Sequence, residues 1–191
     1  MKSINFLFCL LLIFAPIHQI TAQEINTCDI EAAHPSDPNH LGVGKSSSNV
    51  DTFAAISACR EALEESPKNA RFHYQLGRAM VYQGELEQGT AHVQHAADLN
   101  YMQAQFVLGL LIKDDDVCRA ANNFKKAADQ GLKAARITYL KDFLEDAYAG
   151  CAEIAKHEEL TVYLNGAKSQ VAGYYEGLLY NTLAEDLAAR K

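Results

Sequence analysis

Apolar side chains recur every three or four residues along most of this chain, which is the spacing of one face of an α-helix. The first such segment starts after Asp51, a residue suited to an N-cap, and ends before Pro67. The second places Leu76 and Met80 on one face and is closed by Gly84. The later helices are predicted over residues 70–83, 85–99, 101–113, 134–147, 158–165 and 167–189. Another predicted helix starts at the acidic run 114–116 and ends at residue 130. The pattern therefore predicts an all-α protein.

Part of this helical pattern repeats. The dipeptide Leu-Gly at 76–77 recurs at 108–109, and His-Ala-Ala-Asp at 95–98 recurs as Lys-Ala-Ala-Asp at 126–129. A period near 32 residues made of two helix-length segments is typical of an α-solenoid, whose units bury a core only by stacking. The repeat predicts an α-α superhelix over residues 51–166 that presents a binding surface.

The segment before the helices, residues 23–50, has a different composition. It contains two prolines, two glycines and a run of three serines, all of which favour turns. These residues are Pro35, Pro38, Gly42, Gly44 and Ser46 to Ser48. We expect an irregular arm that Cys28 ties to the helices.

The opposite end, residues 167–191, is predicted to form one long helix. Apolar and aromatic residues lie on more than one side of it, namely Tyr174, Tyr175, Leu178, Leu179, Tyr180 and Leu183. We expect it to cap the end of the array. The alternative is an exposed surface that binds a partner or pairs two copies of the protein into a homodimer.

The first 22 residues have the features of a secretory signal peptide. Lys2 is followed by an apolar run over residues 6–17 and then by Ala22, a small residue at which cleavage can occur. The run is too short to span a bilayer as a helix, so we expect cleavage near Ala22 and no stable membrane insertion afterwards. The alternative is an uncleaved anchor. The predicted location is the periplasm or the outside of the cell.

The formal net charge of −7 limits the class of partner. An acidic protein has no excess of Lys and Arg with which to neutralise phosphates, so the charge argues against nucleic acid. The same argument applies to electrostatic docking on an anionic membrane surface. A protein or peptide partner is the remaining expectation.

Four cysteines remain after cleavage: Cys28, Cys59, Cys118 and Cys151. An even number in an exported protein indicates two disulfides, and four cysteines allow three pairings. The separations of 31 and 33 residues are close to one repeat, which favours Cys28–Cys59 and Cys118–Cys151. A zinc site is the alternative, but the sequence has no Cys-x-x-Cys pair.

Three stretches of the sequence resemble two known protein modules. Residues 104–109 (Ala-Gln-Phe-Val-Leu-Gly) and 126–131 (Lys-Ala-Ala-Asp-Gln-Gly) are similar to the Sel-one-like repeat, a relative of the tetratricopeptide repeat that is common in bacterial envelope proteins. Residues 28–63 resemble a module that precedes such repeats in exported proteobacterial proteins. That second resemblance implies that Cys28 pairs with Cys59.

The resemblance also suggests where a partner binds. In tetratricopeptide-like stacks the first helices of successive units line the concave face, so equivalent positions form columns. Six residues are predicted there: Tyr74, Phe106 and Ile137 in one column, and Arg78, Leu110 and Lys141 in the other. Apolar and basic side chains in columns suit an extended peptide or a partner helix. The alternative is that these side chains pack between helices.

No catalytic constellation, cofactor motif or metal motif was found in the sequence. His92 and His95 share a helix face, but Leu99 and Met102 stand where a third ligand would be needed. We therefore predict a non-catalytic, exported interaction module. The alternative is a protein that binds or hydrolyses β-lactams or peptidoglycan fragments, because some cysteine-rich Sel-one-like proteins act on β-lactams. Their cysteines are closely spaced, unlike those here.

Overall fold

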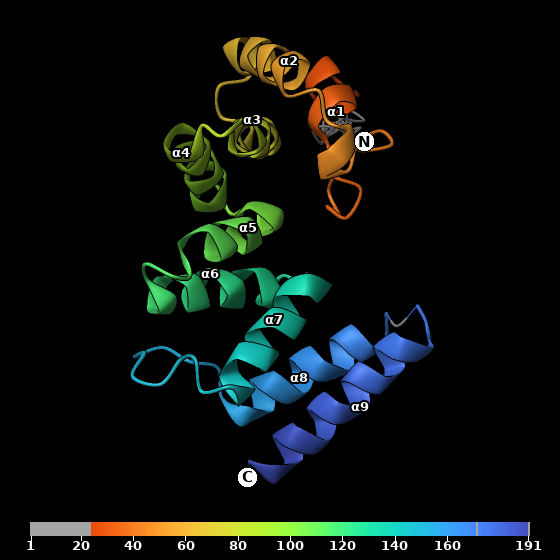
Figure 1. Ribbon diagram of the computed structural model, residues 1–191, viewed down its shortest axis with the longest axis vertical. Coiled ribbons are helices and arrows are strands. Elements are labelled where there is room, and N and C mark those ends of the chain that lie inside the picture. The colour runs from red at the N-terminus through yellow and green to blue at the C-terminus, as the bar shows by residue number, and fades with distance from the viewer. Residues whose placement is uncertain (1–23, 171, 191) are drawn as a thin grey trace, which may run out of the picture.

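The computed structural model describes residues 24–170 and 172–190, and within them every regular element is a helix (Figure 1). The elements are α1 (Thr27–Ala32), the 3-10 helix η1 (Ser47–Asn49), α2 (Thr52–Glu65), α3 (Ala70–Gln83), α4 (Leu86–Asp98), α5 (Met102–Ile112), α6 (Val117–Asp129), α7 (Lys133–Leu144), α8 (His157–Lys168) and α9 (Tyr174–Ala189). None of these helices is long and apolar enough to cross a membrane. The predicted signal peptide lies outside the described residues.

The helix boundaries follow from local capping. The Asp51 carboxylate accepts hydrogen bonds from the first-turn amides of α2, and the Asn69 side chain does the same for α3. α3 ends at Gly84, whose φ of 95° is a left-handed conformation that glycine adopts without steric cost. The predicted helix 70–83 is therefore confirmed at both ends.

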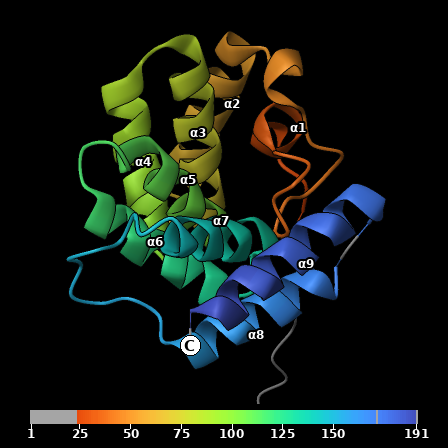
Figure 2. The same ribbon diagram turned by 60° about the horizontal axis from the view of Figure 1, so that its bottom comes forward.

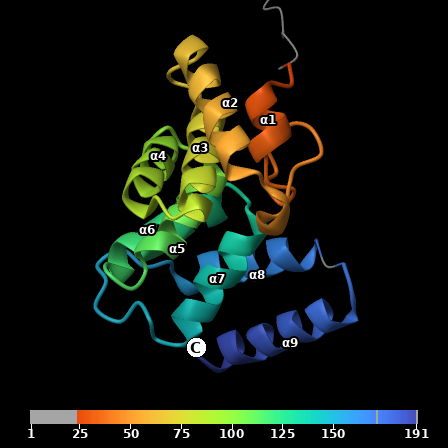
Figure 3. The same cartoon turned by 45° about the horizontal axis from the view of Figure 1, so that its top comes forward.

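Helices that follow one another in the sequence pack side by side, and the stack runs from α1 and α2 at one end to α8 and α9 at the other (Figures 1 and 3). The repeated glycines allow this close packing. A Cβ on Gly77 would lie 2.7 Å from the carbonyl oxygen of Gly89 on α4. A Cβ on Gly109 would lie 2.5 Å from the Phe124 ring on α6. The repeated Leu-Gly dipeptide thus marks where the second helix of each unit crosses the first.

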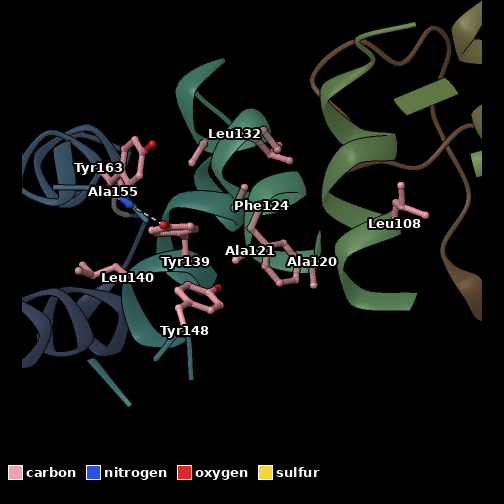
Figure 4. Packing of buried hydrophobic residues seen from close by; sticks show 14 of the residues in the cluster. Leu108, Ala120, Ala121, Phe124, Leu132, Tyr139, Leu140, Tyr148, Ala155 and Tyr163 are labelled. Atoms are coloured by element: carbon pink, nitrogen blue, oxygen red, sulfur yellow. Dashed lines mark hydrogen bonds between the residues drawn. The ribbon is translucent and has the colours of Figure 1, made fainter. Parts of the chain in front are cut away.

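The third unit lacks that glycine and packs through tyrosines instead. Tyr139 of α7 is fully buried, and its hydroxyl accepts a hydrogen bond from the backbone N–H of Ala155 at 2.7 Å (Figure 4). The rings of Tyr148 and Tyr163 lie 4.9 and 5.9 Å from that of Tyr139, centroid to centroid. These contacts hold the loop after α7 and helix α8 against the repeat array.

Two disulfides join Cys28 to Cys59 and Cys118 to Cys151, the pairs that the spacing favoured. The first ties α1 to α2, and the second ties α6 to the loop before α8. All four sulfurs are therefore used in covalent bonds, which removes the thiolates that the alternative zinc site would need. Paired disulfides are typical of proteins from oxidising compartments.

Two predictions about the ends of the chain are wrong. The arm is not irregular throughout, because Asn26 and Asp29 form a capping box that starts helix α1. The single helix predicted over 167–189 is instead divided: its first two residues belong to α8, and α9 starts after Gly173. The break lets α9 turn back and pack against both α7 and α8.

One side of α9 caps the array, as expected, and the other side is open. Three residues of the helix are buried against its neighbours: Tyr180, Leu183 and Leu187. Four others are exposed: Tyr174, Tyr175, Leu178 and Leu179. The expected cap is therefore present, and pairing of two copies through the open side stays a prediction.

Candidate partner-binding site

The N-terminal arm is docked on α3 through a buried ion pair. The Asp29 carboxylate accepts from Nε of Arg71 at 2.7 Å and from its Nη2 at 3.2 Å. The side-chain amide of Gln75 donates to the same carboxylate at 2.9 Å. Asp29 is completely buried and Arg71 is 5% exposed. Such a pair fixes the arm in one position, because either charge alone would be buried without compensation.

Two of the six residues predicted to bind a partner are buried, one under the arm and one in the core. Arg78 donates from Nη1 to the carbonyl oxygen of Ala32 at 2.7 Å and from Nη2 to that of Lys45 at 2.5 Å. Tyr74 is 1% exposed, and its ring lies 5.6 Å from that of Tyr101. Arg78 therefore contacts the protein's own arm, and Tyr74 is buried in the main core, so the first position of each column is not accessible. Sequence reasoning missed Asp29, whose ion pair with Arg71 docks the arm on α3.

The other four predicted residues differ in exposure. Phe106 is half-buried, with its ring 5.8 Å from that of Phe124, and Ile137 is half-buried against the main core. Leu110 is 50% exposed. Lys141 is exposed and forms an ion pair with Glu145, four residues further along α7, at 2.8 Å. Leu110 and Lys141 are therefore the column residues most open to a partner.

A pocket of about 900 Å³ lies between the arm and the N-terminal end of α3. It is lined by Pro38, Asn39, His40, Leu41, Ser66, Pro67, Lys68, Asn69, Ala70, Arg71 and Tyr101. The ionisable side chains of that lining include Lys68, Arg71 and His40 but no carboxylate. Because Arg71 is already paired with Asp29, Lys68 supplies the exposed positive charge of this pocket, which has proline and tyrosine walls.

The wall of the pocket is fixed by a hydrogen bond across the fold. The Tyr101 hydroxyl donates to the Asp37 carboxylate at 2.6 Å, and the Asn39 backbone N–H donates to the other oxygen at 3.0 Å. Burial raises the pKa of Asp37, although both hydrogen bonds oppose that shift. Burial, followed by the negative charge of Asp37, raises the pKa of Tyr101. Tyr101 therefore remains a neutral donor at physiological pH.

A second hollow of about 420 Å³ continues from the first on the other side of Pro38. It reaches Met102 at the start of α5, residues 130–134 before and at the start of α7, and Gln170 after α8. Figure 2 shows the arm and the α8–α9 pair on the same side of the stack. The two hollows thus follow the N-terminal ends of α3, α5 and α7.

Replacing Tyr101 with Phe tests the Asp37 contact. We expect a loss of about 1–3 kcal/mol in unfolding free energy near pH 7, because the buried carboxylate loses its side-chain donor. The folded-state pKa of Asp37 is already raised and would rise further without the hydroxyl. The loss should therefore shrink at about pH 3, where the carboxyl is protonated in both states. Urea unfolding at the two pH values measures this, and an equal loss at both would contradict it.

No family model and no curated protein matches the sequence. Among solved structures, the protein is similar to c5321, a protective antigen present in uropathogenic Escherichia coli strains that displays an SLR fold, that is, a Sel-one-like repeat fold. The TM-score is 0.58 and the sequence identity 22%. The match covers 82% of this chain and 33% of that one. The chain has the SLR fold.

This result confirms the all-α superhelical architecture. The chain spans 33% of the length of the SLR antigen. The similarity therefore shows how the helices pack. The candidate site therefore consists of this chain's own residues, which line the arm pocket and the adjoining hollow.

Proposed function

We propose that this SLR protein is an exported, non-catalytic module of the bacterial envelope that binds a segment of a protein partner. The two disulfides support an oxidising compartment such as the periplasm. Stacked helical repeats commonly present extended binding surfaces. The bound segment would lie on the side of the stack where the arm meets the first helices of the units.

This proposal is based on the pocket between the arm and α3, called the arm pocket. Its volume of about 900 Å³ is large enough for several side chains of an extended peptide. Lys68 supplies positive charge, and the positive end of the α3 dipole adds to it. Pro38 and Tyr101 provide rigid apolar surface. An extended segment with a carboxylate, from Asp, Glu or a free C-terminus, fits this combination best.

Reversing the charge of Lys68 tests this proposal. We expect Lys68→Glu to weaken partner capture at least about tenfold, because the carboxylate would meet a like charge at the pocket rim. The measurement is quantitative capture of envelope proteins by the immobilised protein. Lys126→Glu is the matched control, since Lys126 is an exposed lysine on α6 away from the pocket.

The control decides how the result is interpreted. Capture that is lost in Lys68→Glu and retained in Lys126→Glu supports the pocket as the binding site. An equal effect of both substitutions would mean that overall charge, and not this pocket, governs binding. That outcome would contradict the proposal.

The size and charge of the same pocket are also compatible with a second function, action on β-lactams or peptidoglycan fragments. β-Lactams and peptidoglycan fragments also carry carboxylates, and either is small enough for about 900 Å³. We expect no turnover of nitrocefin or of purified muropeptides by the protein. A rate that scales with protein concentration and falls in Lys68→Glu would replace the adaptor proposal with an enzymatic one.

A further inference from the structure

Three histidines meet on the surface formed by α3 and α4. His73 comes from α3, while His92 and His95 come from α4. The Nδ1 atoms of His73 and His92 are 3.0 Å apart. The His95 ring lies edge-on to that of His73, with 4.2 Å between centroids. All three line one hollow of about 370 Å³, which is open to solvent.

The hydrogen bonds of His73 determine which of its nitrogens is free. Its Nε2 lies 3.0 Å from the carbonyl oxygen of Pro67. A carbonyl can only accept, so Nε2 carries the proton and donates to it. In the neutral ring, Nδ1 then has a lone pair that points at His92. Metal-binding histidines typically have this arrangement, with the second nitrogen held by a backbone carbonyl.

We propose that the Nδ1 atoms of His73 and His92 form a two-nitrogen site for a divalent transition metal, with Cu²⁺ preferred. If the two rings turn so that both lone pairs face one ion, nitrogens 3.0 Å apart can each lie about 2 Å from it, which gives an N–metal–N angle of roughly 90°. That angle suits the tetragonal geometry of Cu²⁺, and imidazole is a good ligand for it. When the metal binds, the proton on Nδ1 of His92 is exchanged through solvent for one on Nε2. The imidazole of His92 therefore stays neutral.

The neighbouring groups are consistent with this site. Within the described residues, no three His, Cys, Asp or Glu side chains are arranged to hold a metal, so the anchor consists of two nitrogens and solvent completes the shell. Burial lowers the pKa of both His73 and His92, and the hydrogen bond to Pro67 opposes that shift for His73. Arg60 also faces His92 but is exposed on α2 and can turn into solvent.

The test is calorimetric titration of the tag-free protein with Cu²⁺ at neutral pH. We expect one site, and binding at least about tenfold weaker in His73→Ala and in His92→Ala, because each removes one of the two nitrogens. Zn²⁺ should bind the same site more weakly than Cu²⁺. Electron paramagnetic resonance of the Cu²⁺ complex should show two imidazole nitrogens.

His95→Ala is the matched control, because it removes a histidine of the same cluster that is not part of the Nδ1 pair. We expect it to change the Cu²⁺ affinity less than about threefold. Thermal unfolding of each variant without metal identifies any that misfold, and the resonance spectrum of the unmodified protein tests the site independently. Unchanged affinity in His73→Ala, or a spectrum without two imidazole nitrogens, would overturn the proposal.

Discussion

Replacing Arg71 with Met is expected to lower the free energy of unfolding by about 3–5 kcal/mol, the cost of leaving a buried charge without its partner. The Asp29 carboxylate is completely buried. It would keep hydrogen bonds from Gln75 and from the Asn26 backbone but lose its counter-charge. The arm should then separate from α3 before the rest of the molecule unfolds. Urea unfolding measures the loss, and amide hydrogen exchange over residues 26–33 locates it.

Two further variants separate the ion pair from general effects of losing an arginine. Arg60→Met removes an exposed arginine from α2 and should change stability by less than about 0.5 kcal/mol. The double variant Asp29→Asn with Arg71→Met should recover part of the loss, because no charge is left unpaired. A loss below about 1 kcal/mol in Arg71→Met would show that the arm is held mainly by other contacts.

Gly77→Ala is expected to cost about 2–3 kcal/mol, although alanine is the better helix former. The new Cβ would lie 2.7 Å from the backbone oxygen of Gly89 and 2.9 Å from the backbone nitrogen of Val93. Backbone atoms cannot move aside as a side chain can, so α3 and α4 must separate. Chemical denaturation of the variant measures the loss.

Gly177→Ala is the matched control, since a Cβ at this position in α9 would contact nothing within 4 Å. There the higher helix propensity of alanine should stabilise the protein by up to about 1 kcal/mol. The two substitutions are thus expected to have opposite signs. If Gly77→Ala also stabilised, the repeated glycine would not be explained by helix crossing.

The sequence predicted the parts of the fold that depend on local signals. The cap at Asp51 and the left-handed Gly84 set helix ends within a few residues, so α2 and α3 were readily found. The two disulfides followed from a separation close to one repeat. In each case the deciding interaction lies at one helix end or between residues about one repeat apart in sequence.

The arm was not predictable in the same way, because contacts between residues far apart in sequence place it. Asp29 meets Arg71, and Asp37 meets Tyr101, across 42 and 64 positions. A prediction based on equivalent repeat positions therefore assigned Tyr74 and Arg78 to a partner. The structure instead buries Tyr74 in the main core and has Arg78 donate to the arm. The pocket was missed for the same reason, since it exists only where the arm crosses the repeats.

The division of the last helix also depends on tertiary contacts. The apolar pattern continues across residues 167–189, so spacing alone predicts one helix. Burying Tyr180 and Leu183 requires α9 to pack against α7 and α8, so α8 ends at Lys168 and a separate helix starts at Tyr174.

The central claim is that a partner binds in the pocket between the arm and the repeats. Site-specific photo-cross-linking tests it most directly, with a photoreactive residue in place of Leu41 on the pocket wall or of Tyr175 on α9. Tyr175 is 85% exposed and represents the competing surface, including a homodimer. We predict a cross-linked partner from position 41 that Lys68→Glu removes, and none from position 175. Cross-links from position 175 alone, to a partner or to a second copy, would contradict the account.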